Sequence, residues 1–276
     1  MNRKVGVILS YILMLFEVLS TLLLTPFIIR ELGDSEYGVY KLSAAIVAYL
    51  LLLDLGIGNA VTRYVAKYRA QGNTEQCRRF LGLTTIYYAA IALIALVVGV
   101  VLILVYPMAF STGLSADEIA LGQQLLSITI VNTAITLASV GFKNTIIAYE
   151  RFDISRGLSI ISIIIRIVST FVVLKLGFGS VGIVSVNLTL TILTNLIFVF
   201  VVVFKLKLKP KFRGINASMV KDVATYSSFI LIQMVATQIN ACADQVLLGM
   251  FVEASAVIIA VYSVGQQITQ YFQSIG

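Results

Sequence analysis

The sequence predicts an all-α protein that crosses a membrane several times as a polytopic helix bundle. Of its 276 residues, 59% are hydrophobic and only 12% are charged, and the mean hydropathy is +0.99. A soluble domain carries about 25% charged residues. Apolar segments of about 20 residues, the length of a membrane-spanning helix, recur along the whole chain. These segments are too uniformly apolar for the alternating strands of a membrane barrel.

Eight candidate spans follow one another along the chain. We expect them at about 7–29, 39–61, 81–106, 119–148, 154–176, 181–204, 223–251 and 256–275. The first span follows Arg3 and Lys4 without a cleavage site, so we expect it to be retained. The first six spans form one lobe at 1–204, a basic linker occupies 205–221, and the last two spans at 222–276 begin a second lobe.

The charge of the connections between spans alternates. Fifteen of the 20 Lys and Arg residues fall on one side, whereas Arg30, Lys41 and Lys175 fall on the other; Lys143 and Arg166 lie within spans. Because cytoplasmic loops carry the excess of Lys and Arg, this pattern places the N-terminus on the cytoplasmic side of the membrane. We expect that membrane to be the plasma membrane of a bacterium or an archaeon. The net charge of +7 therefore reflects topology and gives no reason to expect nucleic acid as a partner.

The composition excludes several kinds of chemistry. The chain has no His and only two Cys, Cys77 in a basic loop and Cys242 in the seventh span. Histidine acid–base chemistry, a disulfide framework and a thiolate metal site are therefore not supported. We expect no catalytic residue, no metal ion and no cofactor.

Arg166 is the most costly residue to place in a membrane. Counted from the start of its span at Ile154, it lies ~18 Å deep at ~1.5 Å per residue, near the middle of a ~30 Å hydrocarbon core. A charge at that depth costs ~2.5–3.5 kcal/mol on insertion scales, and it usually marks a polar cavity or a charged partner.

Four spans carry a polar edge at helical spacing. These edges are Glu17 and Thr21 in the first span; Thr129, Asn132, Thr136, Ser139 and Lys143 in the fourth; Ser155, Ser159, Ser162, Arg166 and Ser169 in the fifth; and Gln233, Thr237, Asn240 and Asp244 in the seventh. Such edges either join helices by hydrogen bonds or line a water-filled cleft. For Arg166 the structural alternative is a buried ion pair with Glu17, and Lys143 either reaches the interface or faces the cleft.

A cleft lined in this way suits an anion, because a guanidinium group binds phosphate through two hydrogen bonds. Arg166 and Lys143 are the candidate phosphate ligands. Glu17, Asp54 and Asp244 could instead bind H⁺ or Na⁺ and couple transport to an ion gradient.

Two N-terminal stretches carry a family resemblance. They are LTPFIIRELGDSEYGVY at 24–40 and LDLGIGNA at 53–60, the latter followed by RYVAKY at 63–68. Both resemble the N-terminal region of polysaccharide-biosynthesis flippases, the O-antigen-type translocases of the multidrug/oligosaccharidyl-lipid/polysaccharide exporter superfamily.

The resemblance implies about 12–14 helices in two lobes, with alternating access to a central cavity. It implies transport of undecaprenyl-diphosphate-linked oligosaccharide for O-antigen, capsule or exopolysaccharide, with a glycan polymerase or glycosyltransferases as neighbours in the pathway. It also places Arg30, Arg63 and Asp54 in family motifs, the arginines as headgroup ligands and the carboxylate as an ion-coupling group. With eight expected spans, we expect the chain to be an incomplete form.

Three other functions stay open. A cation-coupled multidrug exporter of the same superfamily would depend on Glu17 and Asp54 and not on Arg166. A membrane-embedded glycosyl- or phosphotransferase would need an acidic loop cluster, for which Asp117 and Glu118 are weak candidates. A scaffold in a glycan-assembly complex would tolerate changes in the cavity.

Overall fold

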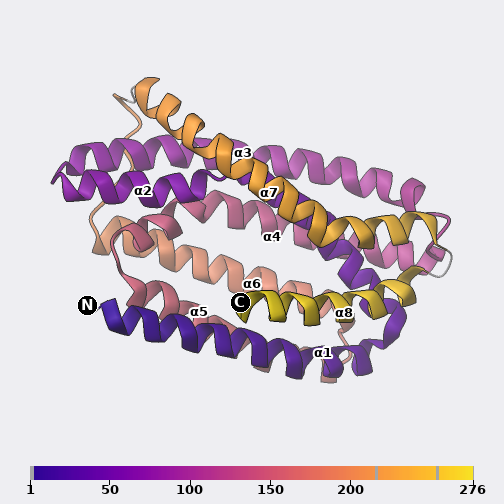
Figure 1. Cartoon of the computed structure of the whole chain (residues 1–276). Helices are drawn as coiled ribbons and strands as arrows, with labels where there is room; N and C mark the ends of the chain where they lie inside the picture. The colour runs from indigo at the N-terminus through magenta and orange to yellow at the C-terminus, as the bar shows by residue number, and fades with distance from the viewer. Residues whose placement is uncertain (1–2, 215–216, 253–254, 276) are drawn as a thin grey trace.

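The computed structural model describes residues 3–214, 217–252 and 255–275, and within these ranges it contains helices and no β-strand (Figure 1). The predicted all-α fold is confirmed. The helices run back and forth along one axis. Their bounds are α1 Arg3–Ala48, α2 Ile57–Ala70, α3 Thr74–Phe110, α4 Ala116–Ala148, α5 Phe152–Lys175, α6 Gly179–Phe200, α7 Ala217–Phe251 and α8 Ser255–Ile275.

Five helical stretches in the described residues are long and apolar enough to cross a membrane. The first, Tyr11–Ala70, has 60 residues and covers the first predicted span from residue 11 onward and the whole of the second. The other four, which fall within 74–205, coincide with the third to sixth predicted spans. Helices α7 and α8 occupy the positions of the seventh and eighth.

Helix α1 turns back on itself at Gly33. A straight helix of its 46 residues would be ~69 Å long, more than twice the thickness of the hydrocarbon core. Gly33 has φ 78° and ψ 166°, a conformation open to glycine and strained for other residues. Figure 1 shows the chain reversing at the end of the bundle away from the N-terminus. We call residues 3–32 the first arm of α1 and residues 34–48 the second arm.

This turn corrects the position of Lys41. The charge pattern groups Lys41 with the connections on the outer side, although it lies just inside the predicted span at 39–61; the structure places it in the second arm, half-buried. The two arms are joined at the non-helical Gly33, so the polar residues at 34–36 already belong to the second arm.

The second predicted span is broken, and the expectation of one continuous helix at 39–61 is wrong. A short 3₁₀ helix, Tyr49–Asp54, follows the second arm, and Leu55 and Gly56 then adopt positive φ values of 52° and 73° before α2 begins. A Cβ on Gly56 would lie 2.6 Å from the side chain of Ile230 on α7, so this position requires glycine for both backbone and packing reasons. The break leaves Asp54 at a helix end inside the bundle.

Helix α4 begins with a capping box. The backbone N–H of Ser115 donates to Glu118 Oε2 at 2.7 Å, and the Glu118 N–H donates back to Ser115 Oγ at 3.4 Å. The Ser35 hydroxyl also donates to Glu118, which ties the α1 turn to the start of α4. We call this end of the bundle the acidic end.

The basic linker is docked on α3. The Lys211 N–H donates to the carbonyl oxygen of Arg78 at 2.9 Å, the Arg78 Nε–H donates to the Lys209 carbonyl oxygen at 3.1 Å, and Lys211 forms an ion pair with Glu75. A Cβ on Gly82 would lie 2.2 Å from the Lys211 carbonyl oxygen, so glycine permits this contact. Helix α7 begins at Ala217, so the linker is shorter than the predicted 205–221. We call this end the basic end.

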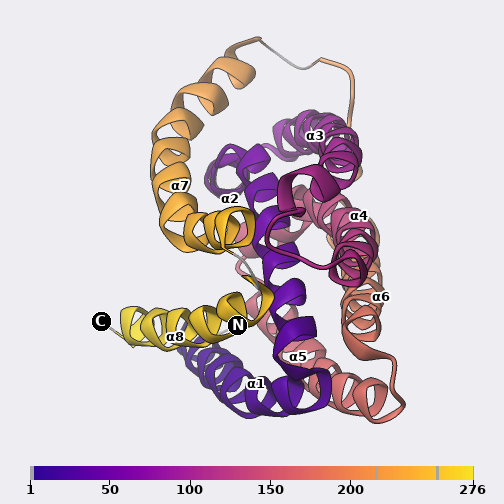
Figure 2. The ribbon, with the colours of Figure 1, turned by 90° about the vertical axis from the view of Figure 1, so that its right-hand side faces the viewer.

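Two apolar clusters hold the bundle together. One joins α2, α3, α4, α6 and α7 around Phe80 and Ile146, and the other joins the second arm of α1 to α3, α4 and α8 around Leu42 and Leu125. Viewed along the helices, α3, α4, α6 and α5 form an arc on one side, α7 and α8 lie on the other, and the second arm lies between them (Figure 2).

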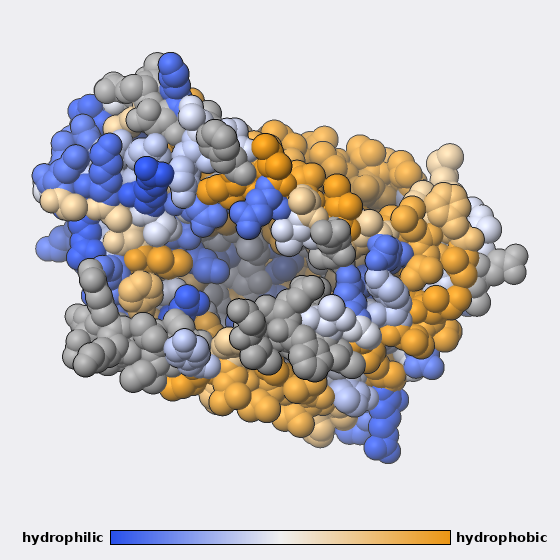
Figure 3. Space-filling view, in the orientation of Figure 1, coloured by the Kyte–Doolittle hydropathy of each residue, from blue (hydrophilic) through white to orange (hydrophobic). Residues whose placement is uncertain are grey.

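The lateral surface is apolar. Large apolar side chains such as Leu23, Leu104 and Met108 are exposed on it, as expected for a face that contacts lipid. Figure 3 shows hydrophilic residues gathered at the basic end, an apolar band along the helices, and a hollow between α7 and α8 in which hydrophilic residues are visible.

Candidate functional site

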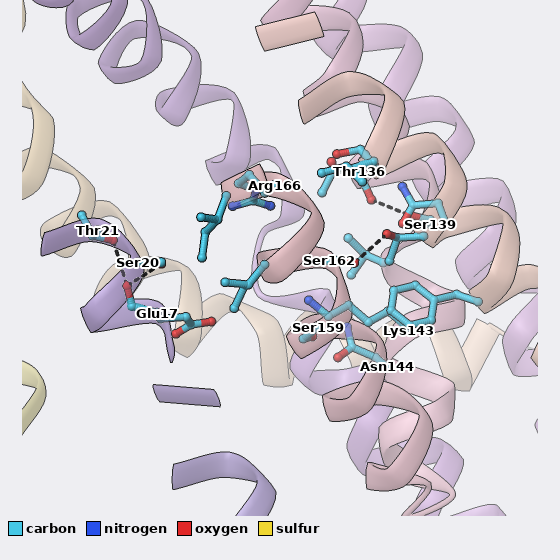
Figure 4. Close-up of a pocket in the computed structure, with 18 of the residues that line it drawn as sticks. Glu17, Ser20, Thr21, Thr136, Ser139, Lys143, Asn144, Ser159, Ser162 and Arg166 are labelled. Carbon is cyan, nitrogen blue, oxygen red and sulfur yellow. Dashed lines mark hydrogen bonds between the residues drawn. The ribbon is translucent and has the colours of Figure 1, made fainter. Parts of the chain in front are cut away.

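The polar edges of α1, α4 and α5 converge on one cavity, which we call the main cavity. Its volume is about 490 Å³, within the ~300–1,000 Å³ typical of ligand sites. Helix α6 supplies the remaining wall. The polar and charged residues that line it are Glu17, Ser20, Thr21, Thr136, Ser139, Lys143, Asn144, Ser159, Ser162, Arg166, Thr191, Thr194 and Asn195 (Figure 4).

Arg166 lies on the α5 wall of the main cavity. Its side chain is exposed, and among the described residues no carboxylate lies within the 4.0 Å of an ion pair. Glu17 lines the same cavity from α1, and Figure 4 shows the two residues on separate helices. The predicted alternative, a structural ion pair between Arg166 and Glu17, is therefore not formed. The guanidinium group is left to interact with whatever enters the cavity.

Lys143 adds a second cation to the same space. It lines the main cavity from α4, one turn from the basic end of that helix. Among the described residues it forms no ion pair. With Arg166 and Lys143 opposed by the single carboxylate of Glu17, the described lining has an excess of positive charge.

The hydroxyl groups of the wall are mostly bonded to their own helices. Thr136 donates to the Asn132 carbonyl oxygen at 2.8 Å, and Ser159 donates to the Ser155 carbonyl oxygen at 3.0 Å. Between helices, the hydroxyls of Ser162 and Thr194 lie 3.3 Å apart. The wall thus presents hydroxyl oxygens as acceptors, while the strong donors facing the cavity are the two cations.

Several predicted site residues lie outside the main cavity. Arg30 is exposed near the acidic end, and the Arg63 guanidinium stacks 4.8 Å from the ring centroid of Tyr226, which joins α2 to α7. Asn132 and Ser169 are half-buried but do not line the cavity. These four residues lie on the predicted helical faces or in the predicted motifs, but they do not line the main cavity.

The predicted edge of α7 also stays away from the main cavity. Gln233 is exposed, and Asp244 accepts a hydrogen bond from the Tyr262 hydroxyl of α8. The side chain of Asn240 lies outside the described residues. The described residues of the α7 polar edge therefore do not line the main cavity, and Asp244 contacts α8.

Asp54 lies in a separate buried cluster. The Tyr88 hydroxyl donates to Asp54 Oδ1 at 2.6 Å, and the neighbouring Tyr87 hydroxyl donates to the Leu53 carbonyl oxygen at 3.2 Å. Both tyrosines belong to α3, so they fix the break between the second arm and α2. Across the described residues, no group of three or more Cys, Asp and Glu side chains is arranged to hold a metal ion.

Two features of the site were missed from the sequence. Helix α6 carries Asn187, Thr191 and Thr194 at 4-3 spacing, which is a helical polar edge of the kind recognised elsewhere and would have predicted the fourth wall. Lys41 lines a second cavity beside Arg166, and no local signal distinguishes it from a loop lysine.

Comparisons with known proteins agree with this architecture. A family model for polysaccharide biosynthesis proteins matches residues 4–275. No curated protein sequence matches the chain.

Several solved structures share the fold at low sequence identity. A MATE protein crystallised with MaD3S is 17% identical, with a TM-score of 0.64 over 98% of this chain and 68% of that chain. A MOP superfamily transporter from Pyrococcus furiosus, described as having a binding pocket of reverse polarity, is 15% identical, with a TM-score of 0.63 over 96% of this chain and 66% of that chain. An outward-facing multidrug resistance MATE family transporter is 17% identical, with a TM-score of 0.63 over the same shares. The chain thus spans about two thirds of the length of these proteins.

The chain is a multi-pass membrane protein: its membrane-length helices pack around a cavity with cations that form no ion pair in the described residues. It has the fold of the MOP superfamily transporters. Within that class the family match is specific. The chain belongs to the polysaccharide biosynthesis protein family.

Proposed function

We propose that this chain forms the headgroup-binding part of a transporter that moves a lipid-linked oligosaccharide across the plasma membrane. Arg166 and Lys143 would bind the diphosphate that joins the lipid to the sugars. The lipid chain would stay in the bilayer while the sugars pass through the main cavity. The observation that supports this proposal best is the guanidinium group of Arg166, which lines the main cavity without an ion-pair partner among the described residues.

The energetics favour an anionic ligand. A charge near the bilayer centre costs ~2.5–3.5 kcal/mol on insertion scales, and a structural carboxylate partner would offset that cost. Arg166 has no such partner among the described residues. A diphosphate supplies the missing negative charge and accepts two hydrogen bonds from one guanidinium group.

Transport would proceed by alternating access. We propose that the N-terminus is cytoplasmic, that α7 and α8 belong to a second lobe, and that the two lobes rock around the bound headgroup. Glu17, which shares the cavity with both cations, is the best placed of the predicted ion-coupling residues. A glycan polymerase or glycosyltransferase would supply or consume the transported lipid.

A cation-coupled multidrug exporter is the second candidate. Glu17 in the cavity wall and the fold shared with MATE proteins favour it. A cationic drug would need that carboxylate and would be repelled by Arg166 and Lys143. The two functions therefore predict opposite effects of removing the cavity cations.

The test measures binding of a fluorescent undecaprenyl-diphosphate disaccharide to the purified protein in detergent. Hydrogen bonds to charged groups contribute ~1.5–3 kcal/mol, so Arg166→Ala should weaken binding roughly 10- to 150-fold. Arg166→Lys should recover part of the loss. Arg30→Ala, which removes an exposed arginine outside the cavity, is the matched control and should bind like the wild type.

Two results would contradict the proposal. One is equal binding by Arg166→Ala and Arg30→Ala. The other is a lipid affinity that does not depend on Arg166, together with binding of a lipophilic cation that is lost in Glu17→Gln, which would favour the exporter.

A further inference from the structure

A second cavity lies on the other side of Arg166. This small cavity has a volume of about 170 Å³ and shares Arg166, Ser20 and Thr21 with the main cavity. Its other lining residues include Ile28 and Ile183, which lie near the acidic ends of their helices. Arg166 therefore stands between two polar spaces that follow each other along the membrane axis.

The small cavity has a cation of its own. Lys41 lines it from the second arm of α1, half-buried, with its ammonium group 5.4 Å from the ring centroid of Tyr37. No carboxylate among the described residues lies within 4.0 Å of that group. From the basic end to the acidic end, the described cavity walls thus present Lys143, Arg166 and Lys41 in turn.

Asn187 supplies a further polar group without a partner. It lines the small cavity from α6, and its buried side-chain oxygen has no hydrogen-bond partner in the described residues. The amide can turn to present its NH₂ group as a donor to an anion. A buried amide oxygen with no protein partner is the feature expected of a side chain that completes its bonds with a ligand or water.

The size of the small cavity fits a phosphate group. Its volume is more than ten times the roughly 10–15 Å³ of probe space that one water molecule needs, which leaves room for a phosphate group with its waters.

Contacts between α1, α8 and α5 lie beside this space. Gln267 of α8 accepts a hydrogen bond from the Thr25 hydroxyl at 3.1 Å and donates to the Tyr37 hydroxyl at 3.2 Å. Phe27 and Phe171 stack with ring centroids 4.8 Å apart. These contacts join α1 to α8 and to α5 next to the small cavity.

We propose that Lys41, Arg166 and Asn187 form a second phosphate subsite in the small cavity. A phosphate group bound between Lys143 and Arg166 would move to this subsite by leaving Lys143 and binding Lys41, while it stays bound to Arg166. This inference rests on the proposed function, because it assumes that a phosphate-bearing lipid enters the main cavity.

The test uses two cysteine reporters in a chain whose native Cys77 and Cys242 are replaced by alanine. Ile167→Cys reports on the main cavity and Ile28→Cys on the small cavity, and neither isoleucine is a proposed ligand. The measurement is the rate of modification by a neutral methanethiosulfonate, with and without geranyl diphosphate. Both rates should fall at saturation, by about twofold each if the bound group divides its time equally between the two cavities, because the two fractional losses then sum to about one.

Lys41→Met separates the two subsites. In this variant the ligand should no longer slow modification of Ile28→Cys, while protection of Ile167→Cys should persist or increase, which also shows that the protein is folded. Lys41→Arg should restore protection at Ile28→Cys. Lys221→Met removes an exposed lysine at the basic end of α7 and should change neither reporter.

The outcomes distinguish this inference from the proposed function. Protection of Ile167→Cys alone, or protection of Ile28→Cys that survives Lys41→Met, overturns the second subsite and leaves the proposed function standing. Protection of neither reporter contradicts both. Inorganic pyrophosphate tests whether the lipid part of the ligand contributes to binding. Protection by pyrophosphate at the same concentration as geranyl diphosphate would overturn the lipid assignment, whereas a ~10-fold higher concentration for the same protection would support it.

Discussion

The hydrogen bond between Tyr88 and Asp54 should hold the broken second span in place. Tyr88→Phe removes only the hydroxyl, which donates to Asp54 Oδ1 at 2.6 Å from a fully buried ring. A hydrogen bond to a charged group contributes ~1.5–3 kcal/mol, and its loss leaves the Asp54 carboxylate without that donor.

Tyr87→Phe is the matched control on the adjacent residue. Its hydroxyl donates to the Leu53 carbonyl oxygen at 3.2 Å, a neutral bond at the same break. Neutral side-chain hydrogen bonds in a membrane protein average ~0.6 kcal/mol. At ~2–4 °C per kcal/mol, we expect the Tm to fall by about 3–12 °C in Tyr88→Phe and by about 1–2 °C in Tyr87→Phe.

The chain has no Trp, so thermal unfolding in detergent is best followed by far-UV circular dichroism. In a double-mutant cycle, Tyr88→Phe should cost much less in an Asp54→Asn background, because the charged acceptor is already gone. Equal Tm values for the two single tyrosine variants would refute the reasoning, since they would mean that Asp54 contributes no more than a neutral carbonyl oxygen.

Two further predictions concern packing and topology. Gly38→Ala should lower the free energy of unfolding by ~1–3 kcal/mol in the same assay, because the new Cβ would lie 1.7 Å from the Ala256 carbonyl oxygen of α8. Gly265→Ala is the control: its Cβ would meet nothing within 4 Å, so this variant should be as stable as the wild type or more stable. In a cysteine-free background on intact cells, a membrane-impermeant thiol reagent should label Ser111→Cys and should reach Gln71→Cys only after lysis. Labelling in the reverse order would invert the proposed orientation.

Local signals in the sequence predicted most of the helices. The apolar segments coincide with the observed spans because helices in lipid must satisfy their own backbone hydrogen bonds. Ser115 and Glu118 form a capping box in a pattern readable from sequence. The helical edges that contain Glu17, Lys143 and Arg166 line one cavity, since residues three and four apart share a face.

What the sequence did not provide is which face meets which neighbour. Arg63 follows a family motif, but it packs against Tyr226 because α2 lies beside α7. Lys41 looks like a loop residue because hydropathy does not reveal that the helix continues on both sides of Gly33. Asp54 turns toward Tyr88 because of the break at Gly56, which depends on contact with α7. These contacts depend on how the helices pack against one another, and residue spacing within a single helix does not predict them.

The hydroxyl-rich wall of the main cavity has a consequence for selectivity. Ser20, Thr21, Thr136, Ser139 and Ser159 all donate their protons to carbonyl oxygens of their own helices. Such a surface holds water and accepts hydrogen bonds from any sugar hydroxyl, but it has few directed donors with which to tell one sugar from another. Under the proposed function, such a passage would tolerate variation in the glycan, so a surface polysaccharide would change through its assembling enzymes without a matching change in this chain.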